Sequence, residues 1–107
     1  MAPTYGSLVL GAHDETGRLV YIGNVGTGFT QVARRIIRRT LDEIAVSASA
    51  FEPAPPEAAA GGWHWVAPIL VGDVEYREFA GARLRMPSWK GLRTDKAPAQ
   101  VEVPPVR

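Results

Sequence analysis

Residues 21–44, YIGNVGTGFTQVARRIIRRTLDEI, hold the change from strand to helix that decides the fold. The β-branched and aromatic residues at the start are typical of a strand. Three glycines within residues 23–28 then require a bend or a close approach of the backbone. Thr30 offers a hydroxyl that can cap a helix. The stretch therefore predicts a strand that ends in a glycine-rich turn and leads into a helix after Thr30.

The helical run is amphipathic. Its apolar face combines residues three or four positions apart, namely Val32, Ala33, Ile36, Ile37, Thr40, Leu41 and Ile44. The opposite face carries Arg34, Arg35, Arg38 and Arg39. These arginines suggest DNA contact, but Arg38 with Asp42 and Arg39 with Glu43 stand four residues apart, as ion pairs on a solvent-exposed helix do. We favour the solvent-exposed face over the nucleic-acid contact.

Strand patterns surround the helix. Residues 7–10 and 18–22 predict a hairpin joined by a polar turn. Residues 69–79 predict one long strand in which Gly72 marks a bulge or a sharp bend, and residues 83–86 predict its hairpin partner. The Pro- and Ala-rich residues 47–62 predict a flexible loop, and residues 100–103 a last short strand before the tail at 104–107. This order fits a mainly β fold, a small curved antiparallel sheet with one α-helix.

Length and composition bound the function. The 107 residues suit a single domain, and 46% hydrophobic residues can build a core. There is no cysteine, and His13 and His64 are the only histidines, so we expect no metal site. No apolar run approaches the length of a membrane span, so a soluble, cytoplasmic protein is expected.

The formal charge of +1 conceals a basic segment. Residues 83–96 hold five basic residues and one acid, a local charge of +4. At its end Arg93, Asp95 and Lys96 place two cations around a carboxylate. Guanidinium and ammonium groups clamp phosphate oxygens, and a carboxylate can orient either cation. The same spacing is more often a plain surface salt bridge, so both alternatives stay open at this point.

Four motifs together resemble the C-terminal OB-fold domain of ATP-dependent DNA ligases, most of all the bacterial non-homologous end-joining type, ligase D and its stand-alone relatives. They are residues 21–29, the amphipathic helix, the pattern WVxPxLVxxVEY at 65–76, and RLRxPxWxGLRxDK at 83–96. The resemblance covers residues 5–101. It implies an OB fold, with nicked or broken duplex DNA and an adenylation domain as partners, and a place in bacterial DNA repair near the nucleoid.

The resemblance also implies a role for the last motif. Arg93, Asp95 and Lys96 match the terminal Arg-x-Asp-Lys motif, which contacts the β- and γ-phosphates of ATP while a lysine of the adenylation domain attacks the α-phosphate. ATP and Mg²⁺ are thus expected in the whole enzyme, and neither is expected on this domain alone. Lys90, Arg83 and Arg85 are candidate contacts to the DNA backbone, together with Asn24, where many relatives carry Lys or Arg. Trp89 is expected in the core.

Three departures from the family pattern matter. There is no Lys-x-Asp-Gly motif, so the lysine that becomes adenylated is missing and the isolated chain should be inactive. The two-lysine motif that closes the adenylation domain is absent, as is the first OB strand that precedes residues 5–7 in relatives. We therefore expect a fragment of a longer ligase whose open sheet edge is covered by the tail or pairs with a second copy.

Two other classes of function stay open. One is a free-standing OB-type nucleic-acid-binding module without a catalytic role. Against it stands the small number of aromatic residues, nine in all, which must also build the core. The other is a protein-interaction domain without phosphate chemistry, which the near-neutral charge permits.

Overall fold

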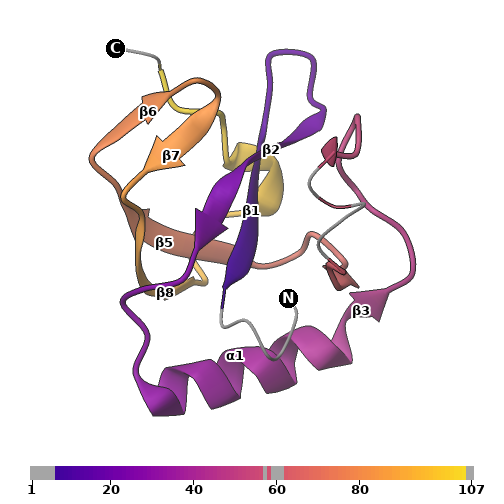
Figure 1. The fold of residues 1–107 in the computed structure, drawn as a ribbon. Coiled ribbons are helices and arrows are strands. Elements are labelled where there is room, and N and C mark those ends of the chain that lie inside the picture. Colours follow the sequence, from indigo (N-terminus) through magenta and orange to yellow (C-terminus); the bar gives the residue numbers. More distant parts are fainter. Residues whose placement is uncertain (1–6, 57, 59–61, 106–107) are drawn as a thin grey trace.

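A hairpin of two long strands forms the centre of the molecule (Figure 1). The computed structural model describes residues 7–56, 58 and 62–105. Strand β1 (Leu8–His13) pairs antiparallel with β2 (Leu19–Val25), as the sequence predicts, and their register shifts between Leu10 and Gly11. Such an irregularity increases the local twist of a strand pair, which bends this hairpin across the core.

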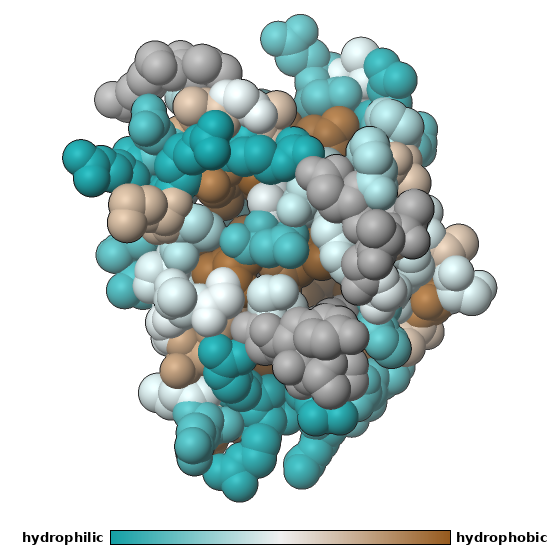
Figure 2. Space-filling model, viewed as in Figure 1, coloured by the Kyte–Doolittle hydropathy of each residue, from teal (hydrophilic) through white to brown (hydrophobic). Residues whose placement is uncertain are grey.

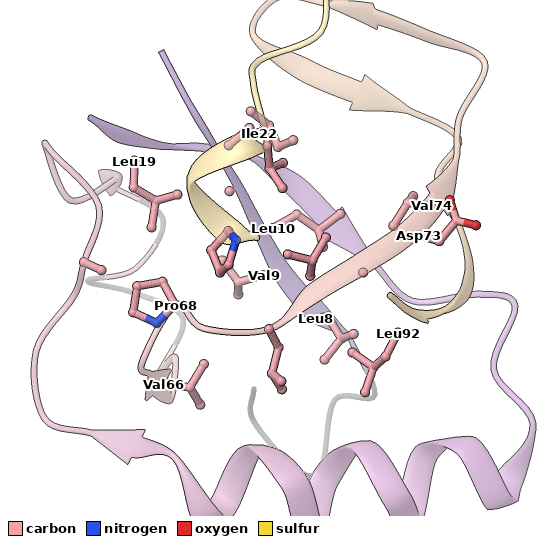
Figure 3. Close-up of a pocket in the computed structure, with 18 of the residues that line it drawn as sticks. Leu8, Val9, Leu10, Leu19, Ile22, Val66, Pro68, Asp73, Val74 and Leu92 are labelled. Carbon is pink, nitrogen blue, oxygen red and sulfur yellow. The ribbon is translucent and has the colours of Figure 1, made fainter. Parts of the chain in front are cut away.

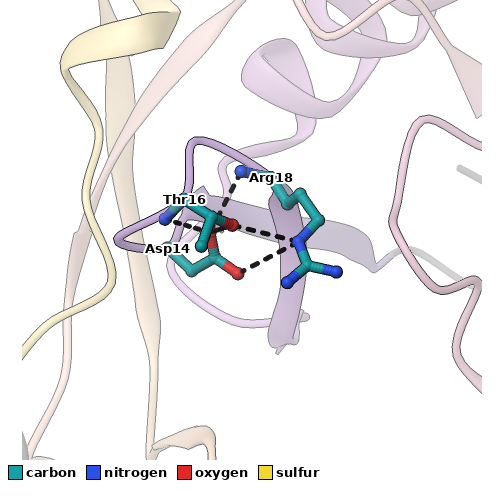
Figure 4. Close-up of polar contacts among 3 residues, drawn as sticks. All are labelled: Asp14, Thr16 and Arg18. Atoms are coloured by element: carbon teal, nitrogen blue, oxygen red, sulfur yellow. Dashed lines mark hydrogen bonds and ion pairs between the residues drawn. The ribbon is translucent and has the colours of Figure 1, made fainter.

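The turn of this hairpin is held by one carboxylate (Figure 4). Asp14 Oδ1 accepts hydrogen bonds from the backbone N–H groups of Thr16 and Arg18 at 2.9 and 3.0 Å, and from Thr16 Oγ1 at 2.7 Å. Gly17 occupies the left-handed region with φ +83°, which favours glycine. The hydrogen bond from the Thr16 side chain is the main cause that lowers the pKa of Asp14 below its ordinary value.

The amphipathic run forms helix α1 (Gln31–Glu43) below the hairpin in Figure 1. The Thr30 hydroxyl accepts the hydrogen bond of Ala33 N–H at 3.0 Å, so the predicted cap is confirmed. Ile37 is the buried residue of the helix, whereas Val32 and Ile36, which the periodicity assigned to the core face, are more than half exposed. The buried stripe of the helix is therefore narrower than the apolar face that the periodicity predicts.

The expectation of one long strand at 69–79 is wrong. The segment divides into β5 (Val71–Glu75) and β6 (Glu78–Ala80), because its two halves have different partners. Strand β6 forms a hairpin with β7 (Arg83–Arg85), while β5 pairs antiparallel with β8 (Ser88–Arg93), a strand that the sequence analysis did not predict. Pairing is regular at Gly72, where a bulge was expected; the register shifts instead between Asp73 and Val74, where Lys90 of β8 is the extra residue.

Trp89 explains the nearby glycines. Its ring is 5% exposed and stacks on Phe29 with the centroids 5.4 Å apart. A Cβ at Gly72 would collide with this indole, and a Cβ at Gly28, where φ is +90°, would lie 2.5 Å from the carbonyl oxygen of Trp89. Gly28 and Gly72 therefore allow β8 to sit close to both the turn before α1 and strand β5, and the prediction that Trp89 belongs to the core is confirmed.

The described part of the loop is attached to the hairpin. Two short strands, β3 (Ala45–Val46) and β4 (Trp65–Val66), pair with each other at its two ends. The backbone N–H of Glu52 donates to the carbonyl of Leu19 at 2.9 Å, and Phe51 packs edge-on against Tyr21. Residues 57 and 59–61 lie outside the described residues, and the expected flexibility of residues 47–62 stays a prediction.

The tail covers one end of β1. The strand expected at residues 100–103 is replaced by a 3-10 turn, η1 (Pro98–Gln100), followed by a single parallel bridge between His13 and Glu102. His13 N–H donates to the carbonyl of Val101 at 2.8 Å, and Val103 N–H donates to the carbonyl of His13 at 3.0 Å. Part of the expected open edge is therefore closed by this chain's own tail, while residues 106–107 lie outside the described range.

The core has two clusters, and Leu10 of β1 packs against both of them. One joins Leu8, Val25, Ile37 and Trp89, and the other Ala12, Ile22 and Phe79. An apolar cavity of about 420 Å³ lies between β1, α1 and the β5–β8 pair, and Figure 3 shows side chains of all three strands around it. Brown hydrophobic side chains are visible in the hollow at the centre of Figure 2. The expected mainly β architecture with one helix is confirmed, although the described residues form four two-stranded pairs and no closed barrel.

Candidate functional site

The Arg-x-Asp-Lys motif lies at the end of β8. Arg93 is the last residue of this strand and pairs with Val71 of β5, so the backbone of the motif is anchored in a sheet. Asp95 and Lys96 follow where the chain leaves the strand. The buried Trp89 fixes β8 four residues before Arg93. Strand β8, which the sequence analysis did not predict, thus holds the backbone of the motif in place.

Arg93 and Asp95 form a two-point contact. Arg93 Nε donates to Asp95 Oδ1 at 3.1 Å, and Nη2 donates to Oδ2 at 2.8 Å. These hydrogen bonds are the main cause that lowers the pKa of Asp95 below its ordinary value and raises the pKa of Arg93. The side chains are 40% and 68% exposed, so solvent screens the pair and it contributes little to the stability of the fold.

The contact orients the guanidinium without saturating it. Asp95 occupies the Nε and Nη2 edge of Arg93, so the N–H groups of Nη1 stay available to a second acceptor. Lys96 is half-buried and lines the apolar cavity, three residues beyond Arg93. Its positive charge also lowers the pKa of Asp95. A guanidinium edge and an ammonium held near one another can bind adjacent phosphate groups.

Asp73 is a second acid beside Arg93 that the sequence analysis did not single out. It pairs with Gly91 on β8, two residues before Arg93, and its charge contributes to the raised pKa of Arg93 after that of Asp95. The register places the two side chains on the same face of the β5–β8 pair, in diagonal positions. The strand pairing that reveals this neighbour was not predicted.

The residues predicted to contact DNA do not all lie together in the structure. Lys90 Nζ lies 3.4 Å from Glu75 Oε1, so it forms an exposed ion pair across the β5–β8 strands. Arg85 is exposed at the end of β7. Arg83 stacks over the ring of Tyr21, with its guanidinium carbon 4.4 Å from the ring centroid. The Tyr21 hydroxyl donates to Asn24 Oδ1 at 2.7 Å. The structure therefore brings Arg83 and Asn24 together around Tyr21 and does not bring Lys90 into that group.

Tyr21 is part of an aromatic cluster that the sequence analysis missed. Its ring centroid lies 5.1 Å from that of Trp63 and 5.9 Å from that of Phe51. Trp65 completes the cluster, 5.8 Å from both Trp63 and Phe51. The spacing Trp63-His64-Trp65, which turns two indoles to one side of an extended segment, is the signal that could have revealed it.

The described residues lack two other features. Among residues 7–56, 58 and 62–105, no three His, Asp or Glu side chains come together as possible metal ligands. Within the same ranges, no helix is long and apolar enough to cross a membrane.

The fold and the motif define a class of protein. The sequence model of the family described as ATP dependent DNA ligase C terminal region matches residues 1–96, and the chain belongs to this family. It is similar to the multifunctional non-homologous end joining protein LigD of Mycolicibacterium smegmatis, with 42% identity over 97 residues. The LigD protein of Pseudomonas aeruginosa is 36% identical over 99 residues. These alignments cover 90% of this chain but only 13% and 12% of the two relatives.

Solved structures agree with this assignment. The crystal structure of the ligase domain from M. tuberculosis LigD has a TM-score of 0.82 and 37% identity, and the alignment covers 90% of this chain and 32% of that one. A mycobacterial DNA ligase D complexed with ATP and MES has a TM-score of 0.80 and 36% identity, with 92% and 33% covered. The expected ligase OB-fold class is thereby confirmed.

Proposed function

We propose that this chain orients the β- and γ-phosphates of ATP through Arg93, Asp95 and Lys96 while a ligase becomes adenylated, and then holds nicked duplex DNA for strand joining. The chain spans about an eighth of its LigD relatives, so the complete reaction belongs to a longer protein that supplies the nucleophilic lysine. The similar mycobacterial DNA ligase D is complexed with ATP and MES, which supports ATP as the substrate.

The observation that carries the proposal is the two-point contact between Arg93 and Asp95 at the end of β8. It leaves the Nη1 edge of Arg93 in a fixed direction, with Lys96 three residues away. When the α-phosphate is attacked, negative charge builds on the departing pyrophosphate. Cations held in place before the reaction stabilise that charge without reorganisation.

In this proposal the chain contributes the cations of Arg93 and Lys96 to the reaction. Mg²⁺ is proposed only for the complete enzyme, and no step of the present proposal depends on it. Asp95 acts here as a positioning residue, because it contacts Arg93 rather than phosphate.

The DNA contact is proposed around Tyr21. Arg83 and Asn24 lie together there, and an arginine with an amide can contact the phosphate backbone or the groove edge of a duplex. Lys90 is already paired with Glu75, and Arg85 lies exposed on β7, so both are secondary candidates. Affinity for DNA in the isolated chain should fall steeply as salt rises.

A chimera tests the phosphate role. This chain would replace the matching C-terminal region of the M. tuberculosis LigD ligase domain, to which its fold is similar. In this chimera Arg93→Ala and Lys96→Ala should each slow enzyme–AMP formation by about 10²- to 10³-fold. Sealing of a nick that already carries AMP should change little, because pyrophosphate has left by then.

Arg39→Ala on the exposed side of α1 is the matched control, since it also removes one surface arginine. Unchanged adenylation in both motif variants would overturn the phosphate role. For the isolated chain, salt-insensitive and sequence-selective DNA binding would favour the alternative, a free-standing nucleic-acid-binding module.

A further inference from the structure

A second cavity of about 230 Å³ lies at the C-terminal end of α1, between this helix and the short β3–β4 pair. Its walls include Trp63, Trp65 and Asp42. Figure 1 places β3 far from the β6–β7 hairpin, but Trp63 on the cavity wall contacts Tyr21, over which Arg83 stacks, so the cavity borders the group around Arg83.

The charges at this end of the helix are unusual. The C-terminus of a helix carries a partial negative charge, which basic residues normally offset. Here the last turn contains Asp42 and Glu43 and no basic residue. Arg38 and Arg39 stand one turn earlier, yet in the described part of the chain neither lies within 4.0 Å of these carboxylates. The C-terminal end of the helix therefore presents the carboxylate of Asp42 to the cavity, which His64 also lines.

The two indoles supply an aromatic wall. Trp63 and Trp65 meet edge to face, with an interplanar angle of 71°, so together they form a corner. Tyr21 and Phe51 support them from other sides. An aromatic corner and a carboxylate that line one cavity are suited to a flat cation, which binds to the faces of the rings.

The chain already uses aromatic rings in this way. The guanidinium of Arg83 lies 4.4 Å from the centroid of Tyr21, and that of Arg34 lies 4.9 Å from the centroid of Phe29. A phosphate-bearing ligand, in contrast, would meet the carboxylate and the negative end of the helix. The charges therefore favour a cationic ligand over nucleic acid.

We infer that this cavity binds an arginine side chain of a partner polypeptide, with the guanidinium against Trp63 and Trp65 and its N–H groups directed to Asp42. Arginine suits the site better than lysine, because its planar guanidinium stacks on aromatic rings and can donate hydrogen bonds to both oxygens of one carboxylate at the same time. The site would thus be a contact for a basic protein segment, independent of the phosphate motif.

The test uses the 107-residue chain and the short peptide acetyl-Gly-Arg-Gly-amide. Nuclear magnetic resonance would follow the indole N–H signals of the three tryptophans during titration. The signals of Trp63 and Trp65 should shift with millimolar affinity, while that of Trp89, which is 5% exposed in the core, should stay in place. The same peptide with citrulline, which is uncharged but of similar shape, should cause little shift.

Asp42→Asn should weaken the binding of the arginine peptide by about five- to tenfold. Glu43→Gln is the matched control, because it removes the same charge from the next residue, which does not line the cavity. Equal shifts with the citrulline peptide, equal losses in both variants, or a stronger response to a short oligonucleotide would each overturn the inference.

Discussion

The turn at Asp14 and the motif at Asp95 use the same pair of groups, a carboxylate and a guanidinium, in opposite ways. Asp14 accepts hydrogen bonds from two backbone N–H groups, whereas Arg18 Nε lies 3.9 Å from Asp14 Oδ2, so this ion pair is a long one. Asp95 is bound by Arg93 through both oxygens. The first carboxylate shapes the backbone of a turn, whereas the second sets the direction of another side chain. A contact of the second kind is what a ligand site requires.

The largest expected effect comes from removing the support beneath the motif. Trp89→Ala should lower the free energy of unfolding by about 3–5 kcal/mol, because it empties a large buried volume between Phe29 and Gly72. Chemical denaturation measures this loss. Hydrogen exchange should rise most in β8, and rise less at the turn near Asp14. Equal protection of β8 in the variant would show that Trp89 does not fix the strand.

The next effect separates the two carboxylates by function. In the ligase chimera, Asp95→Asn should slow enzyme–AMP formation by about tenfold, because an amide holds the guanidinium of Arg93 less firmly than a carboxylate does. Asp14→Asn is the control. It should lower the melting temperature of the chain and leave adenylation unchanged. If both variants lose adenylation equally, the distinction between turn and motif is wrong.

Much of the first half of the fold follows from the sequence. The hairpin, the Thr30 cap and the helix depend on local signals, namely alternation, turn residues and a 3.6-residue period. The second half depends on pairing between distant segments. Nothing local shows that residues 71–75 pair with β8 while 78–80 pair with β7. The division of the expected long strand, and the neighbour Asp73, follow from that pairing and were missed for this reason.

The site shows the same limit. Arg93, Asp95 and Lys96 were proposed from the sequence because they are neighbours in it and match a family motif. The group around Tyr21 and the aromatic corner at Trp63 join residues from β2, β7 and the loop, so only the folded chain reveals them. Likewise, the exposure of Val32 and Ile36 depends on how much sheet surface faces α1, which periodicity does not report.

A smaller effect concerns the second acid beside Arg93. In the chimera, Asp73→Asn should lower KM for ATP by about two- to threefold at low salt, because it removes a negative charge near the phosphates. The gain should shrink at high salt, where surface charges are screened. Glu78→Gln on β6 is the matched control. A rise in KM would mean that Asp73 positions Arg93 rather than opposing the substrate.

The smallest effect compares the two carboxylates by titration. The pKa values of Asp14 and Asp95 both lie below the ordinary 3.8, through hydrogen bonds from Thr16 and from Arg93 respectively. A carboxyl group whose pKa is lower in the folded chain than in the unfolded chain stabilises the fold at a pH above its unfolded-state pKa. This stabilisation is lost as the pH falls through the folded-state pKa. Carbon chemical shifts of the carboxyl groups, followed from pH 6 to pH 2, measure each pKa.

Arg93→Ala should return the pKa of Asp95 towards 3.8 and leave that of Asp14 unchanged. Thr16→Ala should do the reverse, because the carboxylate of Asp14 is held within its own turn. A shift of both carboxylates in either variant would show that the turn and the motif are electrostatically coupled rather than independent.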